Sequence, residues 1–341
     1  MKFKTFSSAI AISIMAVSLA ACDKQGVNST PAPTPGTPTP APTPTPTPTP
    51  GGGGGSGDSP AAALGYTSDT TFESATSFFA VRPPNTVYGD QEAEPFGEGT
   101  EIEFSADSDS YTFTRSDSTT VTVTPNDIDA DGDLQGEGGL WGSSEGTVYV
   151  VEDGAITHTV AMVPPGAYDD ITMNHMAISL WNIQDSSGQV PTNEIQWQIW
   201  GNRTETMPTS GSATYSIAAV GANGFDPNAD SIPALPGNEG AAYDFFNGQS
   251  TGELGVDFAS GDVNLMLHLI GHDYVADTDK DFGEFIGTGD ITSGADYGGT
   301  FAAGGEFYGA FFGPNAEETG FTFFIDSGDL KATGIGIGFQ D

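Results

Sequence analysis

Residues 253–270 decide the fold of this chain: Glu253-Leu-Gly-Val-Asp-Phe258, a short turn, and Asp262-Val-Asn-Leu-Met-Leu-His-Leu-Ile270. In both stretches every second side chain is apolar, and the residues between them are mostly polar or glycine. A period of two is typical of strands that bury one face, and the Ser-Gly turn between the stretches predicts an antiparallel hairpin. We therefore expect an all-β fold here.

The same alternation recurs through the rest of the C-terminal part. The segments that it predicts as strands are 213–220, 253–260, 262–270, 285–293, 298–303, 306–312, 319–326 and 330–340. The last segment alternates glycine with Ile335, Ile337 and Phe339, which suits a narrow interior filled by large side chains of neighbouring strands. Eight antiparallel strands at this spacing predict a closed barrel, because closure removes exposed strand edges.

Upstream, less regular alternation predicts further strands at 101–105, 110–114, 119–124, 146–151, 155–163, 175–183 and 194–201. No segment after residue 21 has the period of an amphipathic helix. We therefore predict an all-β protein with a strand-rich handle domain over residues 65–205, followed by an eight-stranded antiparallel β-barrel over residues 206–341.

The first 21 residues read as a secretory signal peptide. Lys2 and Lys4 precede the uncharged run Ala9–Leu19, which is too short to span a bilayer of about 20 apolar residues. The junction Leu19-Ala-Ala-Cys22 resembles a lipobox, and Cys22 is the single cysteine of the chain. We expect cleavage before Cys22 and its lipidation by diacylglycerol and palmitate, which makes the membrane the first partner of a lipoprotein.

Residues 22–64 are predicted to be the lipidated cysteine and a disordered stalk. Pro31–Pro50 is largely a Pro-Thr alternation that favours extended polyproline II, and Gly51–Gly55 is a flexible joint. At ~3.1 Å per residue the Pro-Thr part could span roughly 60 Å. We expect display at the surface of the outer membrane, although Asp23 directly after the lipidated residue leaves retention in the inner membrane open.

The charge of the chain excludes several classes of partner. Residues 65–341 contain five basic residues against 44 acidic ones. Nucleic-acid affinity comes largely from Lys and Arg, so a nucleic-acid partner is excluded. Anionic membrane surfaces are repelled for the same reason. Solubility in salty surroundings and association with divalent cations remain as interpretations of the acidity.

Three motifs, in order, carry a resemblance to a known family. They are Gly201-Asn-Arg-Thr-Glu-Thr-Met-Pro-Thr-Ser-Gly-Ser-Ala-Thr-Tyr215, Val256-Asp-Phe258, and Gly309-Ala-Phe-Phe-Gly-Pro-Asn-Ala-Glu-Glu-Thr-Gly-Phe321. These resemble the junction between handle and barrel, the hairpin, and the turn near the barrel's end in the transferrin-binding protein B family of surface lipoproteins. The single handle and barrel resemble the family's one-lobed, solute-binding-like members. The chain departs from the family after Tyr215, where the usual glycine and tryptophan are lacking.

The resemblance implies structural roles for the motif residues. Gly313-Pro314 opens a tight turn, Glu317 or Glu318 can cap amides of the loop, and Gly320 lets the chain re-enter a strand. The motif residues with predicted structural roles are Met207, Pro208, Gly211, Ala213, Tyr215, Val256, Asp257, Phe258, Gly313, Pro314, Ala316, Glu318 and Gly320. They identify the barrel and do not specify a ligand.

Two calcium-like spacings stand out. Asp127, Asp129, Asp131 and Asp133 match the opening of a calcium loop, with Gly132 at the turn position. Position 12 of that loop is Gly138 instead of glutamate and the flanks are predicted strands, which disfavours an EF-hand, and a loop-type Ca²⁺ site and a solvated acidic turn remain alternatives. The run Asp277-Thr-Asp-Lys-Asp281 has similar spacing without the turn glycine.

The histidines raise the question of haem, which needs one or two axial ligands in an apolar pocket. His268 and His272 straddle the end of one predicted strand, and Met173-Asn-His-Met176 clusters soft ligands in the handle. Either set could serve haem, and isolated structural or surface histidines are the alternative.

No catalytic motif is present, so we expect no enzyme. The sequence predicts a binding module of the cell envelope. The family resemblance implies capture of a protein or metal-carrying ligand, in iron or haem acquisition, with a TonB-dependent transporter as a further partner. The alternative function is an acidic, Ca²⁺-stabilised structural lipoprotein of the envelope without a role in nutrient uptake.

Overall fold

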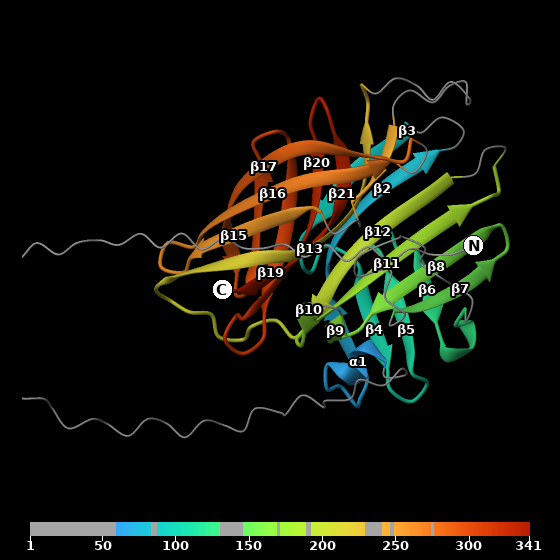
Figure 1. Cartoon of the computed structure of the whole chain (residues 1–341). Helices are drawn as coiled ribbons and strands as arrows, with labels where there is room; N and C mark the ends of the chain where they lie inside the picture. Colours follow the sequence, from blue (N-terminus) through green and yellow to red (C-terminus); the bar gives the residue numbers. More distant parts are fainter. Residues whose placement is uncertain are drawn as a thin grey trace, which may run out of the picture. The chain divides into compact units, whose positions relative to one another are not determined.

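The computed structural model describes residues 59–82, 87–129, 146–168, 171–188, 192–228, 241–245, 249–273 and 276–341, and the statements that follow concern these. The predicted signal peptide and nearly all of the predicted stalk lie outside them. Three antiparallel sheets and one short two-stranded ribbon make up the described fold (Figure 1).

The C-terminal sheet closes on itself. Eight strands pair in succession, and β13 also pairs with β21 to complete the barrel, as the sequence predicted. Its strands are β13 (Ser212–Asp226), β15 (Thr251–Asp257), β16 (Asp262–Asp273), β17 (Thr278–Ser293), β18 (Asp296–Phe301), β19 (Gly305–Phe312), β20 (Glu318–Asp326) and β21 (Lys331–Gln340). A further short strand, β14 (Ala241–Asp244), pairs with the far end of β13 and with His272 of β16.

A six-stranded sheet precedes the barrel, in the order β3-β2-β12-β11-β8-β7. Its strands are β2 (Ala75–Arg82), β3 (Val87–Glu94), β7 (Thr147–Asp153), β8 (Ile156–Val163), β11 (Met176–Asp185) and β12 (Thr192–Gly201). Figure 1 shows this sheet, mostly in green, beside the barrel in orange and red.

The third sheet has four strands in the order β1-β4-β5-β6. They are β1 (Thr70–Glu73), β4 (Glu101–Ser105), β5 (Ser110–Thr114) and β6 (Thr120–Val123). The smaller elements are the ribbon β9 (Gly166–Tyr168) and β10 (Ile171–Met173), the single-turn helix α1 (Pro60–Ala63) and the 3₁₀ turn η1 (Pro125–Asp127).

The six-stranded sheet is apolar on both faces. One face packs Trp181 and Trp200 against the four-stranded sheet, around Phe104 and Phe113. The opposite face packs Trp197, Ile199 and Met176 against the outer surface of the barrel. The barrel residues in that contact are Ala310, Phe312, Ile335 and Ile337. The isoleucines of the Gly-Ile alternation therefore point at the handle, and its glycines point into the barrel.

The fold begins earlier than the sequence predicted. Residues up to 64 were expected to belong to the stalk, but α1 lies at 60–63, with Pro60 at its first helical position. Ala61 and Leu64 are buried in the core between the two handle sheets, and the Ala61 N–H donates to the Tyr111 hydroxyl at 2.8 Å. Burial of these side chains explains why six residues of the predicted stalk are folded.

Candidate functional site

The three sequence motifs meet at one end of the barrel. The Tyr215 hydroxyl donates to the Ala316 carbonyl at 2.6 Å, and the Phe258 N–H donates to the Gly211 carbonyl at 2.9 Å. The rings of Tyr215 and Phe258 both pack against Phe311, at centroid distances of 5.4 and 5.9 Å. The motifs thus close the barrel's interior at this end.

Turns within the motifs need unusual backbone conformations. Gly211 and Gly313 have φ of +87° and +83°, which glycine adopts without steric cost, and Ala316 has φ of +58°. Asp257 caps the turn of the hairpin, because its carboxylate accepts from the Ala259 N–H at 2.8 Å. Met207 and Ala213 are half-buried against the barrel interior. These contacts agree with structural roles.

Glu318 contacts a more distant part of the chain than the sequence predicted. The predicted cap of the loop's own amides is made by Glu317, which accepts from the Asn315 N–H at 2.7 Å. The buried Glu318 carboxylate instead accepts from the backbone N–H groups of Asn174 and His175, at 2.7 and 3.0 Å, in the turn before β11. Burial raises the pKa of this carboxyl, against the lowering effect of those hydrogen bonds. Glu318 therefore joins the barrel to the handle.

Arg203 makes a second polar connection of this kind. One guanidinium nitrogen lies 2.8 Å from both carboxylate oxygens of Asp296 in β18, and the other lies 2.5 Å from Glu73 in β1. Its guanidinium also stands 4.9 Å from the centre of the Phe96 ring. This role could not be predicted from the sequence, since the partners lie 93 and 130 residues away along the chain.

The predicted calcium loop is described only in its first part. Asp127 ends η1, and its carboxylate accepts from both the N–H and the hydroxyl of Thr124, at 2.8 and 2.7 Å, which forms a capping box. The Asp129 N–H donates to the Val148 carbonyl at 2.9 Å. Asp131 and Asp133 lie outside the described residues. The calcium site stays a prediction.

The two histidines considered as haem ligands lie on one face of β16, at alternate positions whose neighbours point into the barrel. A ring nitrogen of His268 lies 2.8 Å from Asp281, and Nδ1 of His272 lies 2.8 Å from Asp279. The hydrogen bond with Asp279 raises the pKa of His272. Both rings thus contact carboxylates on the outer surface. Haem binding also stays a prediction.

The other two histidines, His158 and His175, contact residues that stabilise the fold. His158 accepts from the Trp181 indole N–H at 3.2 Å, and burial lowers its pKa, which favours the neutral ring. His175 lies in the turn that contacts Glu318.

Among the described residues, no group of three or more His, Cys, Asp or Glu side chains is placed to hold a metal ion. Within the same residues, no helix has the length and apolar character that crossing a membrane requires.

The barrel's interior is filled by side chains. Its aromatic residues are fully buried, and they pack ring against ring. The rings within it are Tyr215, Tyr297, Phe301, Phe307, Phe311, Phe321 and Phe323. A Cβ added to Gly336 would lie 2.2 Å from the Phe321 ring, so the glycines of β21 make room for the phenylalanines. This part of the barrel is a packed core.

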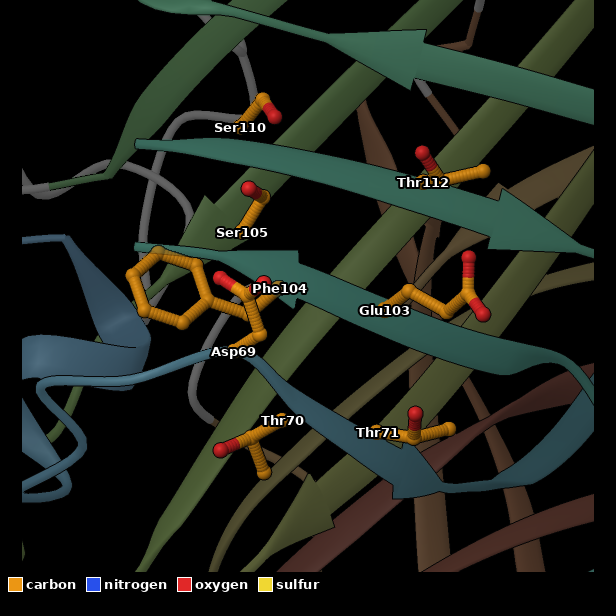
Figure 2. Close-up of a pocket in the computed structure, with 8 residues that line it drawn as sticks. All are labelled: Asp69, Thr70, Thr71, Glu103, Phe104, Ser105, Ser110 and Thr112. Atoms are coloured by element: carbon orange, nitrogen blue, oxygen red, sulfur yellow. The ribbon is translucent and has the colours of Figure 1, made fainter. Parts of the chain in front are cut away.

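A shallow hollow lies on the four-stranded sheet, with a volume of about 330 Å³. Asp69, Glu103 and hydroxyl-bearing residues of β1, β4 and β5 line it, as Figure 2 shows. The Asp69 carboxylate accepts from the Ala106 N–H at 2.9 Å and so connects the residue before β1 to the turn after β4. Thr112 and Thr122 share a hydrogen bond of 2.9 Å beside it. The hollow has a polar, acidic lining without a basic group.

Solved structures of surface lipoproteins are similar to this chain. Transferrin-binding protein B of Haemophilus parasuis has 14% identity and a TM-score of 0.37, with 81% of this chain and 76% of that one covered. The same protein of Actinobacillus pleuropneumoniae has 11% identity and a TM-score of 0.36, covering 79% and 100%. The N-lobe of lactoferrin-binding protein B of Moraxella bovis has 15% identity and a TM-score of 0.30, covering 58% and 81%.

The resemblance expected from the sequence motifs is thus found among solved structures as well. With TM-scores below 0.5 these likenesses carry no argument about ligand or activity, and the fold rests on the strand pairing of this chain. No protein-family model and no curated protein matches the chain.

Proposed function

We propose that this chain is a lipid-anchored, non-catalytic binding module of the cell envelope that captures a protein ligand on its outer surface. The filled barrel is the observation that carries this proposal. A barrel of eight strands can hold one small ligand only where its interior is left open, and here Phe307, Phe321 and Phe323 occupy that interior. The external surface is what remains for recognition.

Rigid attachment of the barrel to the handle supports the same function. The apolar cluster shared by Ile199 of the handle and Ile337 of the barrel, together with Glu318 and Arg203, fixes the two parts against each other. A fixed surface loses little conformational entropy when a partner binds, which favours affinity. Surface loops held by a rigid scaffold are also a common arrangement in recognition proteins.

The predicted N-terminal segment supports a location of the protein at the membrane. A lipid on Cys22 and a stalk through Pro50 would hold the domain away from the membrane, within reach of ligands outside the cell. We propose the outer-membrane surface as the location. The family resemblance of the motifs makes a metal-carrying protein the preferred ligand class, with iron or haem acquisition as the purpose and a TonB-dependent transporter as the recipient.

Titration calorimetry on the full-length protein in detergent tests this proposal. Metal-carrier proteins, haem alone and Ca²⁺ alone are titrated in separate experiments. We expect saturable binding of a protein and no stoichiometric binding of free haem. A Ca²⁺-dependent rise in melting temperature without binding of any carrier would contradict the uptake function and favour the acidic structural lipoprotein.

A further inference from the structure

The barrel's outer surface carries two neighbouring apolar side chains on β16 and β17, of which Ile286 is exposed and Met266 half-buried. Ile286 of β17 is 55% exposed, and Ile128 is the other large apolar side chain with high exposure among the described residues. The register pairs Met266 of β16 with Ile286, so both side chains lie next to each other on the outer face. Together they form a small apolar centre that a partner could cover on binding.

Carboxylates surround this pair. Glu253 of β15 is the register partner of Met266 on its other side. Glu284 and Asp290 stand two and four residues from Ile286 on the same face of β17, and both are exposed. Asp262, also exposed, pairs with Asp290 across β16 and β17. The apolar centre therefore lies within an acidic rim.

Few basic side chains balance this rim, and His268, the register partner of Glu284, contacts Asp281. Between residues 249 and 312 the sequence contains one lysine, Lys280, and no arginine. The Lys280 ammonium contacts the buried Asp226 carboxylate and lies 4.7 Å from the Phe282 ring, so it is engaged at the end of the barrel. The field around Ile286 thus favours cations and repels acidic proteins and anionic lipids.

We propose that this surface, which we call the Ile286 face, docks a protein whose contact region presents Lys and Arg side chains around a small apolar centre. The arrangement has the anatomy of a protein interface, in which a desolvated apolar core is enclosed by a polar rim. Complementary charge sets the choice of partner and speeds the encounter. This inference rests on the proposed function, protein capture, and adds the surface and the chemistry of the partner.

The test uses the full-length protein in detergent and a defined probe. The probe is a synthetic peptide with leucines on one side and lysines around them, titrated by calorimetry at 150 mM salt. The variant is Ile286→Asp, and the matched control is Ile128→Asp, which replaces the other exposed isoleucine and adds the same charge. We expect Ile286→Asp to weaken binding at least tenfold, and Ile128→Asp to bind like wild type.

Equal binding by the two variants would overturn the Ile286 face while leaving protein capture by another surface standing. Absence of peptide binding to wild type would also overturn the face. The proposed function is judged separately, by titration of metal-carrier proteins. Circular dichroism of both variants checks the fold, and Met266→Asp, the partner position on β16, supplies a second disruption of the same face with the same expected loss.

Discussion

The carboxylate of Glu318, the first residue of β20, accepts hydrogen bonds from the backbone of Asn174 and His175, 144 and 143 residues away along the chain. The amide side chain of Asn174 donates to the same carboxylate at 3.1 Å. A buried carboxylate needs hydrogen-bond donors, and the turn that leads into β11 supplies them to Glu318. This relationship fixes the barrel on the handle.

Removal of this carboxylate should destabilise the protein. Glu318→Ala leaves the N–H groups of Asn174 and His175 without this acceptor, and we expect the free energy of unfolding to fall by about 1–3 kcal/mol. Urea denaturation followed by tryptophan fluorescence measures this, because Trp181, Trp197 and Trp200 of the handle are buried. Glu317→Ala is the control, since Glu317 is more exposed and caps an exposed amide. Equal losses in the two variants would contradict the assigned role.

Glu318 also predicts a pH dependence. Burial raises its folded pKa above the ordinary 4.5, so the folded state holds the proton more tightly than the unfolded chain. The contribution of this group to stability is fully present below pH 4.5 and is lost as the pH rises through the folded pKa. We expect Glu318→Gln, which does not titrate, to lose less stability than wild type over that interval. Parallel curves of unfolding free energy against pH would refute this.

The packing of the barrel interior predicts different melting temperatures for alanine substitutions at two glycines. A Cβ at Gly336 would lie 2.2 Å from the Phe321 ring, whereas one at Gly255 of β15 meets nothing within 4 Å. Overpacking a filled core costs about 1–3 kcal/mol, so Gly336→Ala should lower the melting temperature. Gly255→Ala should leave it unchanged or slightly higher. If both variants melt alike, the interior is not packed as described.

His272 should titrate above its ordinary pKa of 6.5. The carboxylate of Asp279 accepts from its ring and favours the charged form. This pair therefore stabilises the folded state below pH 6.5, and the effect is lost as the pH rises through the folded pKa. NMR titration of the ring protons measures the midpoint. Asp279→Asn should lower it and Asp290→Asn should not, and the account fails if neither moves it.

Much of the barrel could be predicted from the sequence, because its strands alternate large apolar residues with glycine or polar ones. The strand predicted at 262–270 is observed as Asp262–Asp273, and the one at 319–326 as Glu318–Asp326. Residues 278–284 were missed as part of β17, since this end of the strand carries polar side chains on both faces. The four-residue β14 offered too short a pattern to detect.

The handle was harder to predict. In β2 the buried positions include Thr76 and Ser77, whose hydroxyls find partners in Ser74 and in the Gly334 carbonyl, and this conceals the alternation. The strands β1 and β3 depend on β4 and β2 as neighbours and carry little local signal. The junction residues Arg203 and Glu318 could not be assigned their contacts, because every partner lies far away in the sequence.

We propose that a macromolecule binds the outside of this protein and that nothing small enters its barrel. Affinity capture from native growth medium or host fluid, with the full-length protein immobilised through its lipid and the eluate identified by mass spectrometry, tests this most directly. We expect a protein to be recovered in stoichiometric amount and to be released by high salt, because the surface is acidic. Recovery of haem or another small molecule alone, with no protein above the level seen on lipid without the chain, would contradict it.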